Sequence, residues 1–247
     1  MIELEHVPVD NLAWALNRRA LAKDEIGDLE GAVADYTAVA ELENVPVEEL
    51  ALALNNRGVL ERDHGDLQGA ISDFTSLAEL ESVPKSVTAI GINNRGRARE
   101  GLGDVDGAIN DYGSCIESGA HLAVVYDALG RLLILLSAQN EIDAAAKWIV
   151  RIGEIETEET SVEQQLEARI EIVSDVAQKC SADSAVSLLD TILDAADAAL
   201  RSRLMFLKPA LEFARAGDES VLAKLPAEEQ EIARRIAREI AQRTDAE

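Results

Sequence analysis

Aromatic residues and positive charge are both scarce in this chain of 247 residues. Phe, Tyr and Trp make up 3% of it, and 47 Asp and Glu outweigh 23 Lys and Arg, which leaves a formal net charge of −24. Nucleic acids require cations that neutralise phosphates and rings on which bases stack, and anionic membrane surfaces also attract basic segments. The composition therefore predicts no nucleic-acid and no membrane partner. The negative charge favours solubility or, alternatively, the steering of a cationic partner.

Cysteine and proline are rare as well, with two and five residues respectively. Cys115 and Cys180 are isolated in the sequence, which is typical of free thiols in a reducing compartment and not of a disulfide framework. Residues 1–5 are acidic and apolar, whereas a secretory signal begins with basic residues. The most apolar stretch, residues 122–138, contains charged side chains and is shorter than the ~20 apolar residues of a membrane-spanning helix. These features predict a cytoplasmic protein.

The sequence also lacks the residue patterns of catalytic and metal sites. Its three histidines, His6, His64 and His121, belong to no His-Glu-x-x-His or Cys-x-x-Cys arrangement with the spacing of metal ligands. Neither a Gly-x-Ser-x-Gly nucleophile turn nor a phosphate-binding Gly-x-x-x-x-Gly-Lys loop is present. We therefore assign no catalytic residue, metal or cofactor and expect a protein that is not an enzyme. An enzyme site within residues 119–247 is the alternative that this pattern leaves open.

What the sequence does contain is a unit of 38 residues that is written three times, at about 9–43, 47–81 and 85–118. Each copy has Asn and Arg in its first half, Gly-Asp at its centre, then Gly-Ala followed by Ile or Val, and then an aromatic residue. Self-similarity at a fixed period of this length is typical of a solenoid. The Gly-Asp break divides each copy into two helices, which are predicted at 9–26, 29–43, 47–64, 67–81, 85–102 and 105–118.

The repeated unit resembles that of the tetratricopeptide repeat (TPR) family, in a longer version than the usual unit of about 34 residues. The resemblance rests on Asn-x-x-Gly in the first helix (Asn55 to Gly58), Gly-Asp at the turn, Gly-Ala at the start of the second helix, an aromatic residue four positions later and Pro at the end. It implies an all-α fold, a right-handed α-α superhelix of antiparallel helix pairs, whose concave groove binds peptides or proteins. It implies no catalysis.

The repeat fades beyond residue 118, and residues 119–247 are predicted to form divergent helical repeats. The predicted segments are a fourth helix pair at 123–136 and 142–155, an acidic connector at 154–163, a fifth pair at 162–180 and 184–199, and a C-terminal capping helix at about 227–243. In the last of these, acidic residues come first and basic residues later, which suits the helix dipole.

Residues that end and begin helices recur at the same places in each copy. Left-handed residues at the end of the first helix are predicted at Gly27, Gly65 and Gly103, and N-caps of the second helix at Asp28, Asp66 and Asp104. A Gly in the first turn of each second helix suggests close contact with a neighbouring element, since Gly destabilises helices. These are Gly31, Gly69 and Gly107.

An Arg recurs where the family generally has Leu, and each Arg precedes an Asp by sixteen residues. The two positions fall on facing helices of the hairpin, so we predict an ion pair inside each repeat. The pairs are Arg19–Asp35, Arg57–Asp73 and Arg95–Asp111.

The resemblance places a partner-binding groove on the first helices of the three copies. Transferred by motif position, its residues are an apolar row of Trp14, Leu52 and Ile90, a ladder of Asn17, Asn55 and Asn93, and a further set of Leu21, Val59, Arg62 and Arg97. A ladder of Asn side chains can hold an extended peptide backbone, because each both donates and accepts hydrogen bonds. Two structural alternatives stay open: the Asn side chains cap backbone groups between repeats, and Trp14 packs against a preceding helix.

We therefore expect a protein-interaction scaffold that binds a peptide or partner protein in this groove. The alternative is a structural spacer or self-association module within a larger protein. Residues 3–9 align with residues 41–47, so the chain opens on the end of a repeat unit. This predicts either a fragment of a longer array or a first helix that a partner covers, a second copy included; a native start is also compatible with it.

Overall fold

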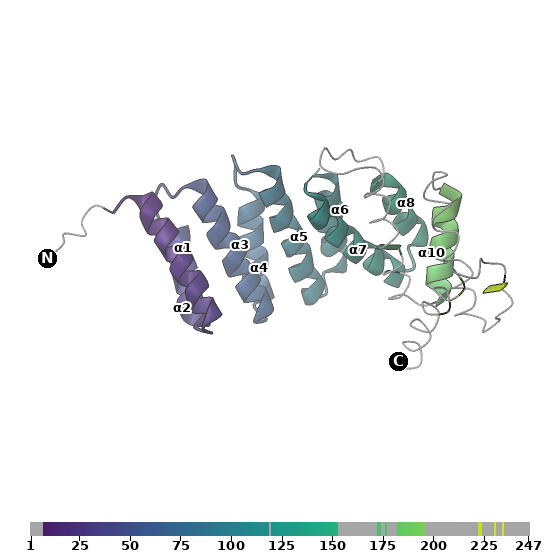
Figure 1. The fold of residues 1–247 in the computed structure, drawn as a ribbon, viewed down its shortest axis with the longest axis horizontal. Coiled ribbons are helices and arrows are strands. Elements are labelled where there is room, and N and C mark those ends of the chain that lie inside the picture. Colours follow the sequence, from purple (N-terminus) through teal and green to yellow (C-terminus); the bar gives the residue numbers. More distant parts are fainter. Residues whose placement is uncertain are drawn as a thin grey trace. The chain divides into compact units, whose positions relative to one another are not determined.

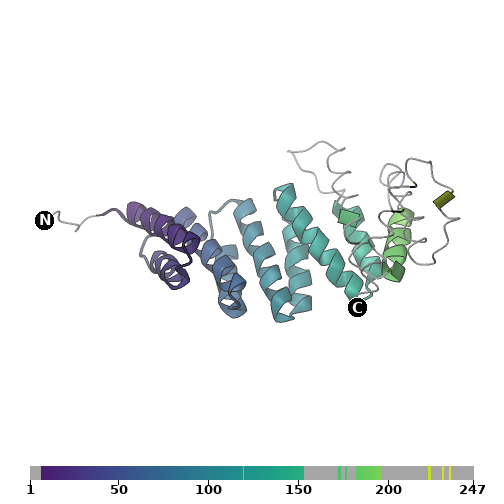
Figure 2. The same cartoon turned by 60° about the horizontal axis from the view of Figure 1, so that its bottom comes forward.

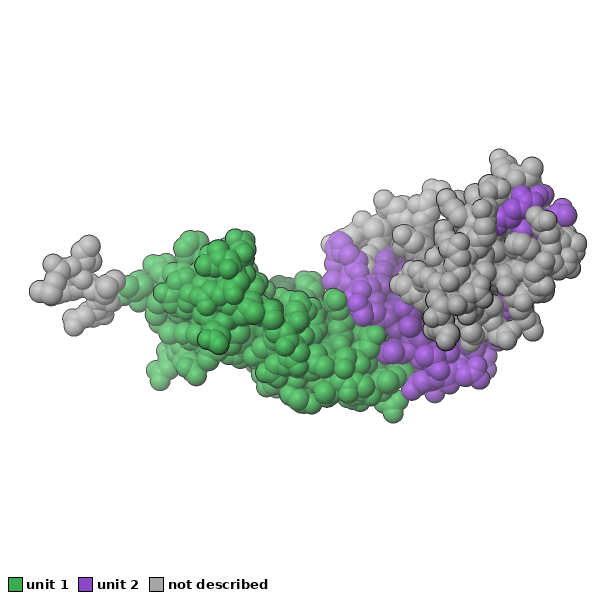
Figure 3. Space-filling model, turned by 90° about the horizontal axis from the view of Figure 1, so that it is seen from below, with its two compact units in different colours: residues 1–120 green, residues 121–247 purple. Residues whose placement is uncertain are grey.

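The computed structural model describes residues 7–118, 120–152 and 182–195, and a few single residues beyond them. The regular elements in those three ranges are α-helices. The chain divides into two compact units, residues 1–120 and 121–247, which are coloured separately in Figure 3.

Unit 1 contains three consecutive antiparallel helix pairs (Figure 1). They are α1 (Val9–Glu25) with α2 (Leu29–Ala40), α3 (Val47–Asp63) with α4 (Leu67–Ala78), and α5 (Lys85–Leu102) with α6 (Val105–Glu117). The second helix of one pair also packs against the first helix of the next, α2 against α3 and α4 against α5 (Figure 2). This arrangement confirms the predicted all-α fold of sequential helix pairs.

The second helices are shorter than predicted. α2 ends at Ala40 and α4 at Ala78, so the predicted ends at residues 43 and 81 are wrong. The segment after each helix is a turn that the repeat pattern does not reveal, and Asn44 and Ser82 in it have positive φ angles of 58° and 67°. A residue in that conformation cannot continue an α-helix, so the chain turns before the Val-Pro that precedes the next first helix.

The turns inside the pairs follow the predicted chemistry. Gly27, Gly65 and Gly103 have φ angles of 80°, 91° and 83°. The Asp residue after each Gly caps the second helix, and Asp28 accepts a hydrogen bond of 3.0 Å from the backbone N–H of Gly31. A Cβ on Gly31 would clash with the Asp28 carboxylate, so the recurring Gly makes room for the N-cap. The predicted close contact with a neighbouring element is also present: Lys23 of α1 donates to the carbonyl oxygen of Gly31 at 3.1 Å, and a Cβ on Gly69 would lie 2.8 Å from Glu61 Oε2 of α3.

Aromatic side chains fill the interior of each pair. Tyr36, Phe74 and Tyr112 are fully buried. A Cβ on Gly58 would lie 2.9 Å from the ring of Phe74. This first-helix position carries no bulk because the aromatic ring of the second helix lies directly against it.

Unit 2 contains α7 (Leu122–Ala138), α8 (Ile142–Ile152) and α10 (Ala182–Ala195), and α8 packs against both α7 and α10. The predicted connector at 154–163 lies outside the described residues, and of the predicted capping helix at 227–243 the structure describes Gln230 and Arg234, both helical. That residues 119–247 are divergent repeats stays a prediction. Within the described parts of the chain, no helix is long and apolar enough to cross a membrane.

Candidate binding surfaces

The predicted Arg–Asp ion pairs form in all three repeats. In the first, Arg19 Nε donates to Asp35 Oδ2 at 2.7 Å and the Nη2 of Arg19 donates to Asp35 Oδ1 at 2.6 Å. Arg57 and Arg95 make the same bidentate contact with their own Asp partners. The hydrogen bond from Arg19 lowers the pKa of Asp35. Planar two-bond contacts of this kind fix the relative position of the two helices, so this Arg has a structural role.

The same Arg side chain also reaches the preceding repeat. The Nη1 of Arg57 donates to the Thr37 hydroxyl of α2 at 2.8 Å, and that of Arg95 donates to Thr75 of α4 at 3.3 Å. Covered in this way, the two side chains are 16% and 18% exposed. Arg19, by contrast, is 60% exposed. Among the described residues, no helix precedes α1 and packs against it in the way that α2 packs against α3.

A second cation completes the ion pair in the outer repeats. The Nζ atom of Lys23 lies 2.9 Å from Asp35 Oδ2, and the Nη1 atom of Arg99 lies 2.8 Å from Asp111 Oδ2. The corresponding residue of the middle repeat, 38 positions from each, is the acidic Glu61. Sequence reasoning did not single out this position, although the signal, a reversal of charge within an otherwise regular repeat, is visible in the sequence.

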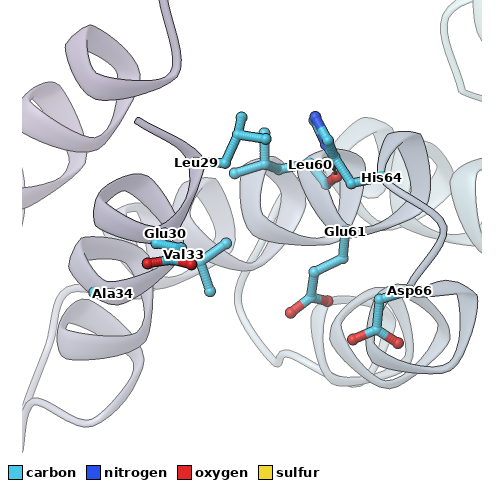
Figure 4. Close-up of a pocket in the computed structure, with 8 residues that line it drawn as sticks. All are labelled: Leu29, Glu30, Val33, Ala34, Leu60, Glu61, His64 and Asp66. Atoms are coloured by element: carbon cyan, nitrogen blue, oxygen red, sulfur yellow. Dashed lines mark hydrogen bonds between the residues drawn. The ribbon is translucent and has the colours of Figure 1, made fainter. Parts of the chain in front are cut away.

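Glu61 lines a pocket of about 450 Å³ between α2, α3 and the start of α4 (Figure 4). The lining residues are Leu29, Glu30, Val33, Ala34, Leu60, Glu61, His64 and Asp66. Figure 4 shows the Glu61 side chain extending toward the start of α4, on the side where Asp66 lies, whereas His64 points the opposite way. The Oε2 atom of Glu61 is buried and has no hydrogen-bond partner.

Burial raises the pKa of Glu61 to about 7. The nearby carboxylates of Asp73 and Asp66 add to the rise, and the guanidinium of Arg57 opposes it. Glu30 and His64 line the same pocket. Near neutral pH the site therefore holds a carboxyl group that is easily protonated, and any cation nearby would favour its ionised form.

Glu61→Gln is expected to stabilise the protein at alkaline pH and to change little at acid pH. The folded-state pKa of Glu61, about 7, lies above the ordinary value of 4.5, so the folded state binds a proton more tightly than the unfolded state. The wild type therefore loses stability as pH rises through this window. Because the side chain is partly solvated, we expect a gain of about 1–2 kcal/mol for Glu61→Gln at about pH 8.

Urea denaturation at about pH 5 and about pH 8 measures this difference, with Glu48→Gln on the exposed start of α3 as the control. If the free energy of unfolding of Glu61→Gln differed from that of the wild type by the same amount at both pH values, the raised pKa of Glu61 would be contradicted.

The predicted groove residues form what we call the first-helix face: Trp14, Asn17, Leu21, Leu52, Asn55, Val59, Arg62, Ile90, Asn93 and Arg97. Its apolar row is partly open to solvent. Trp14 is 54% and Ile90 37% exposed, and Leu52 is half-buried. The Arg18 guanidinium lies 5.8 Å from the centroid of the Trp14 ring, a cation–π contact that holds the indole in place.

The Asn ladder lies largely below this surface. Asn17 is fully buried, and its Nδ2 donates to the backbone carbonyl of Glu49 at 3.0 Å, across the junction between α1 and α3. This contact is the inter-repeat capping that the sequence left as an alternative. Asn93 is also buried, whereas Asn55 is half-buried and accepts a hydrogen bond from Asn94 at 3.2 Å.

The other members of the first-helix face, Leu21, Val59, Arg62 and Arg97, are half-buried. The Nη1 of Arg62 donates to Asn94 at 3.3 Å, which links α3 to α5. Their role in binding stays a prediction. Among the described residues, no group of three or more potential ligands is placed to hold a metal ion.

Comparison with known proteins supports the fold and goes no further. The chain matches no protein-family model and no curated protein sequence. Among solved structures it is similar to BtubC (BKLC) from P. vanneervenii, with 14% identity, a TM-score of 0.51 and coverage of 91% of this chain and 92% of that one. A tetratricopeptide repeat protein from Parabacteroides merdae ATCC 43184 matches with 18% identity, a TM-score of 0.49 and coverage of 92% and 98%.

Proposed function

We propose that this protein is a protein-interaction scaffold that binds an extended peptide or a partner helix on the first-helix face. The observation that carries the proposal is the partly open apolar row of Trp14, Leu52 and Ile90, which occupies the same position on three successive first helices. Apolar side chains spaced at the period of the repeat can contact a long ligand at several points. Trp residues at such places contribute most of the binding energy at many interfaces.

The buried Asn side chains set the rigidity of this face. Because Asn17 joins α1 to α3, the rows of the face keep their spacing without a ligand. A preformed face loses less conformational entropy on binding than a flexible one. We infer that Asn17 and Asn93 support the face from beneath and that the apolar row makes the contacts.

Peptides selected from a displayed random library on the wild-type protein are expected to bind about tenfold more weakly to Trp14→Ala and to Ile90→Ser, because each change removes an apolar contact. The matched control is Ile26→Ser, since Ile26 is 80% exposed but lies at the end of α1, away from the row. Titration calorimetry with the selected peptides measures the three affinities. Equal affinity for all three variants would place the binding elsewhere.

A second candidate, self-association, is favoured by the uncovered side of α1. Ala53 of α3 is buried beneath α2, whereas the corresponding Ala15 is exposed, as is Arg19. Two copies could cover each other's α1 in the way that α2 covers α3. Light scattering over a concentration series separates the candidates: an assembly that Ala15→Glu abolishes supports self-association, and a monomer at every concentration leaves the first-helix face as the binding surface.

A further inference from the structure

The middle repeat lacks a cation that both of its neighbours have. Lys23 donates to the carbonyl oxygen of Gly31 at 3.1 Å as well as contacting Asp35, and Arg99 repeats this pair of contacts at Gly107 and Asp111.

Asp73, the corresponding carboxylate of the middle repeat, has a single ion pair among the described residues, with Arg57. In place of a second cation stands Glu61, whose carboxylate belongs to the same electrostatic cluster. In the first and third repeats a cationic side chain therefore pairs with this Asp. In the middle repeat the corresponding residue carries a carboxyl group.

The reversal of charge coincides with the pocket. In the outer repeats the cation reaches its place on the protein's own side chain. In the middle repeat Glu61 lines a pocket of about 450 Å³ whose surface is mostly apolar, with Leu29, Val33 and Leu60 among its residues. Three acidic residues also line it: Glu30 lies beside Val33 on α2, and Glu61 and Asp66 come from α3 and the turn into α4 (Figure 4).

We propose that this pocket binds a lysine or arginine side chain of a partner protein. Its aliphatic stem lies along Leu29, Val33 and Leu60, and its charged head lies against the carboxyl group of Glu61, the residue that replaces Lys23 and Arg99 of the neighbouring repeats. Long basic side chains bury an apolar stem while they keep the charged head in polar surroundings, and the pocket offers apolar side chains to the stem and acidic residues to the head. The bound cation donates a hydrogen bond to the carboxyl group of Glu61, whose Oε2 atom has no hydrogen-bond partner in the chain.

Other occupants fit this pocket less well. An uncharged apolar ligand would remove Glu61, Glu30 and Asp66 from water without supplying a partner, which is costly for carboxylates. A free inorganic cation would leave the apolar lining residues exposed, and no group of three potential metal ligands occurs among the described residues. The net charge of −24 adds a long-range attraction for any basic partner.

This proposal shares one premise with the proposed function, namely that the chain binds a partner protein, which here supplies the cation. The pocket is distinct from the first-helix face and is tested separately. The probes are the capped tripeptide acetyl-Gly-Lys-Gly-amide and a neutral counterpart with norleucine in place of lysine, which keeps the stem and lacks the ammonium group. Binding is followed by the chemical shifts of backbone amide resonances in NMR spectra of the full chain, at physiological salt so that weak surface attraction is screened.

The lysine peptide is expected to shift the amide resonances of Glu61, His64 and Glu30 in a saturable manner, whereas the norleucine peptide leaves them unchanged. Glu61→Lys places a cation from the chain itself in the site, so it should weaken binding of the lysine peptide at least about tenfold. Glu61→Gln should weaken it less, because the pocket remains open. The matched control is Glu48→Lys, which makes the same change in net charge at an exposed position and should bind as the wild type does.

Three results would overturn the proposal. They are equal binding of the lysine and norleucine peptides, equal loss of binding in Glu48→Lys and Glu61→Lys, and shifts spread over the whole acidic surface. Thermal unfolding gives a second readout that needs no ligand: Glu61→Lys should raise Tm at neutral pH, since it restores the contact that Lys23 makes with Asp35. If the lysine peptide binds the pocket saturably but the Trp14 and Ile90 variants bind the selected peptides as the control does, only the proposed first-helix face is disproved. If those variants bind the selected peptides more weakly but the lysine peptide does not bind the pocket, only the pocket proposal is disproved.

Discussion

Asp111→Ala is expected to lower the free energy of unfolding by about 3–5 kcal/mol, because the partly buried Arg95 loses both of its hydrogen bonds to the carboxylate and Arg99 keeps the longer ion pair with Asp104, at 3.7 Å. Asp111 is 1% exposed. It accepts two hydrogen bonds from Arg95 and forms an ion pair with Arg99. The hydrogen bond to Asp111 also raises the pKa of Arg95. Urea denaturation followed by circular dichroism measures the loss.

The same substitution in the first repeat is the control. Asp35 also has two cationic partners, Arg19 and Lys23, but Arg19 is 60% exposed and is solvated by water when its carboxylate is removed. Asp35→Ala should therefore cost markedly less than Asp111→Ala. Equal losses at the two positions would show that the covering of the Arg by the preceding repeat does not matter for stability.

Phe74→Ala is expected to lower the free energy of unfolding by about 3–5 kcal/mol through the cavity that it leaves in the middle repeat. The Phe74 ring is fully buried and fills the space against Gly58, which has no side chain that could relax into the gap. In a solenoid each repeat is stabilised by its neighbours, so loss of the middle repeat also separates the outer two. We expect a broader unfolding transition as well as a lower midpoint.

Phe74→Leu keeps most of the apolar volume and serves as the matched variant. It should cost about 1–1.5 kcal/mol and leave the transition sharp. Both variants are compared with wild type by thermal unfolding and by the slope of the urea transition. A loss below about 1 kcal/mol for Phe74→Ala would mean that the repeat collapses around the missing ring, against the packing described here.

Much of unit 1 can be predicted from sequence because its chemistry is local or periodic. Gly65 takes the left-handed conformation that ends α3, and Asp66 caps α4; both effects involve residues a few positions apart. The Arg57–Asp73 contact follows from hairpin geometry, since residues equally distant from a turn face each other. Three copies of the same unit make each of these inferences stronger than a single occurrence would.

Burial on the first-helix face, by contrast, depends on residues far away in the chain. The sequence equates Asn17 with Asn55, yet one is buried against Glu49 and the other is half-buried beside Asn94. The repeat pattern likewise does not mark the turns after α2 and α4, which contain single residues with positive φ.

The sequence by itself therefore determined the period, the helix pairs, the turns and the ion pair inside each repeat, because these depend on residue types at fixed spacing. Only the tertiary structure decided which side chains remain accessible, that Glu61 faces a pocket, and that Arg19 lacks the cover which Thr37 gives Arg57. Accessibility and the pKa of a buried carboxyl are set by whichever neighbouring repeat lies against the residue. That neighbour is identified only when the helices are placed in space.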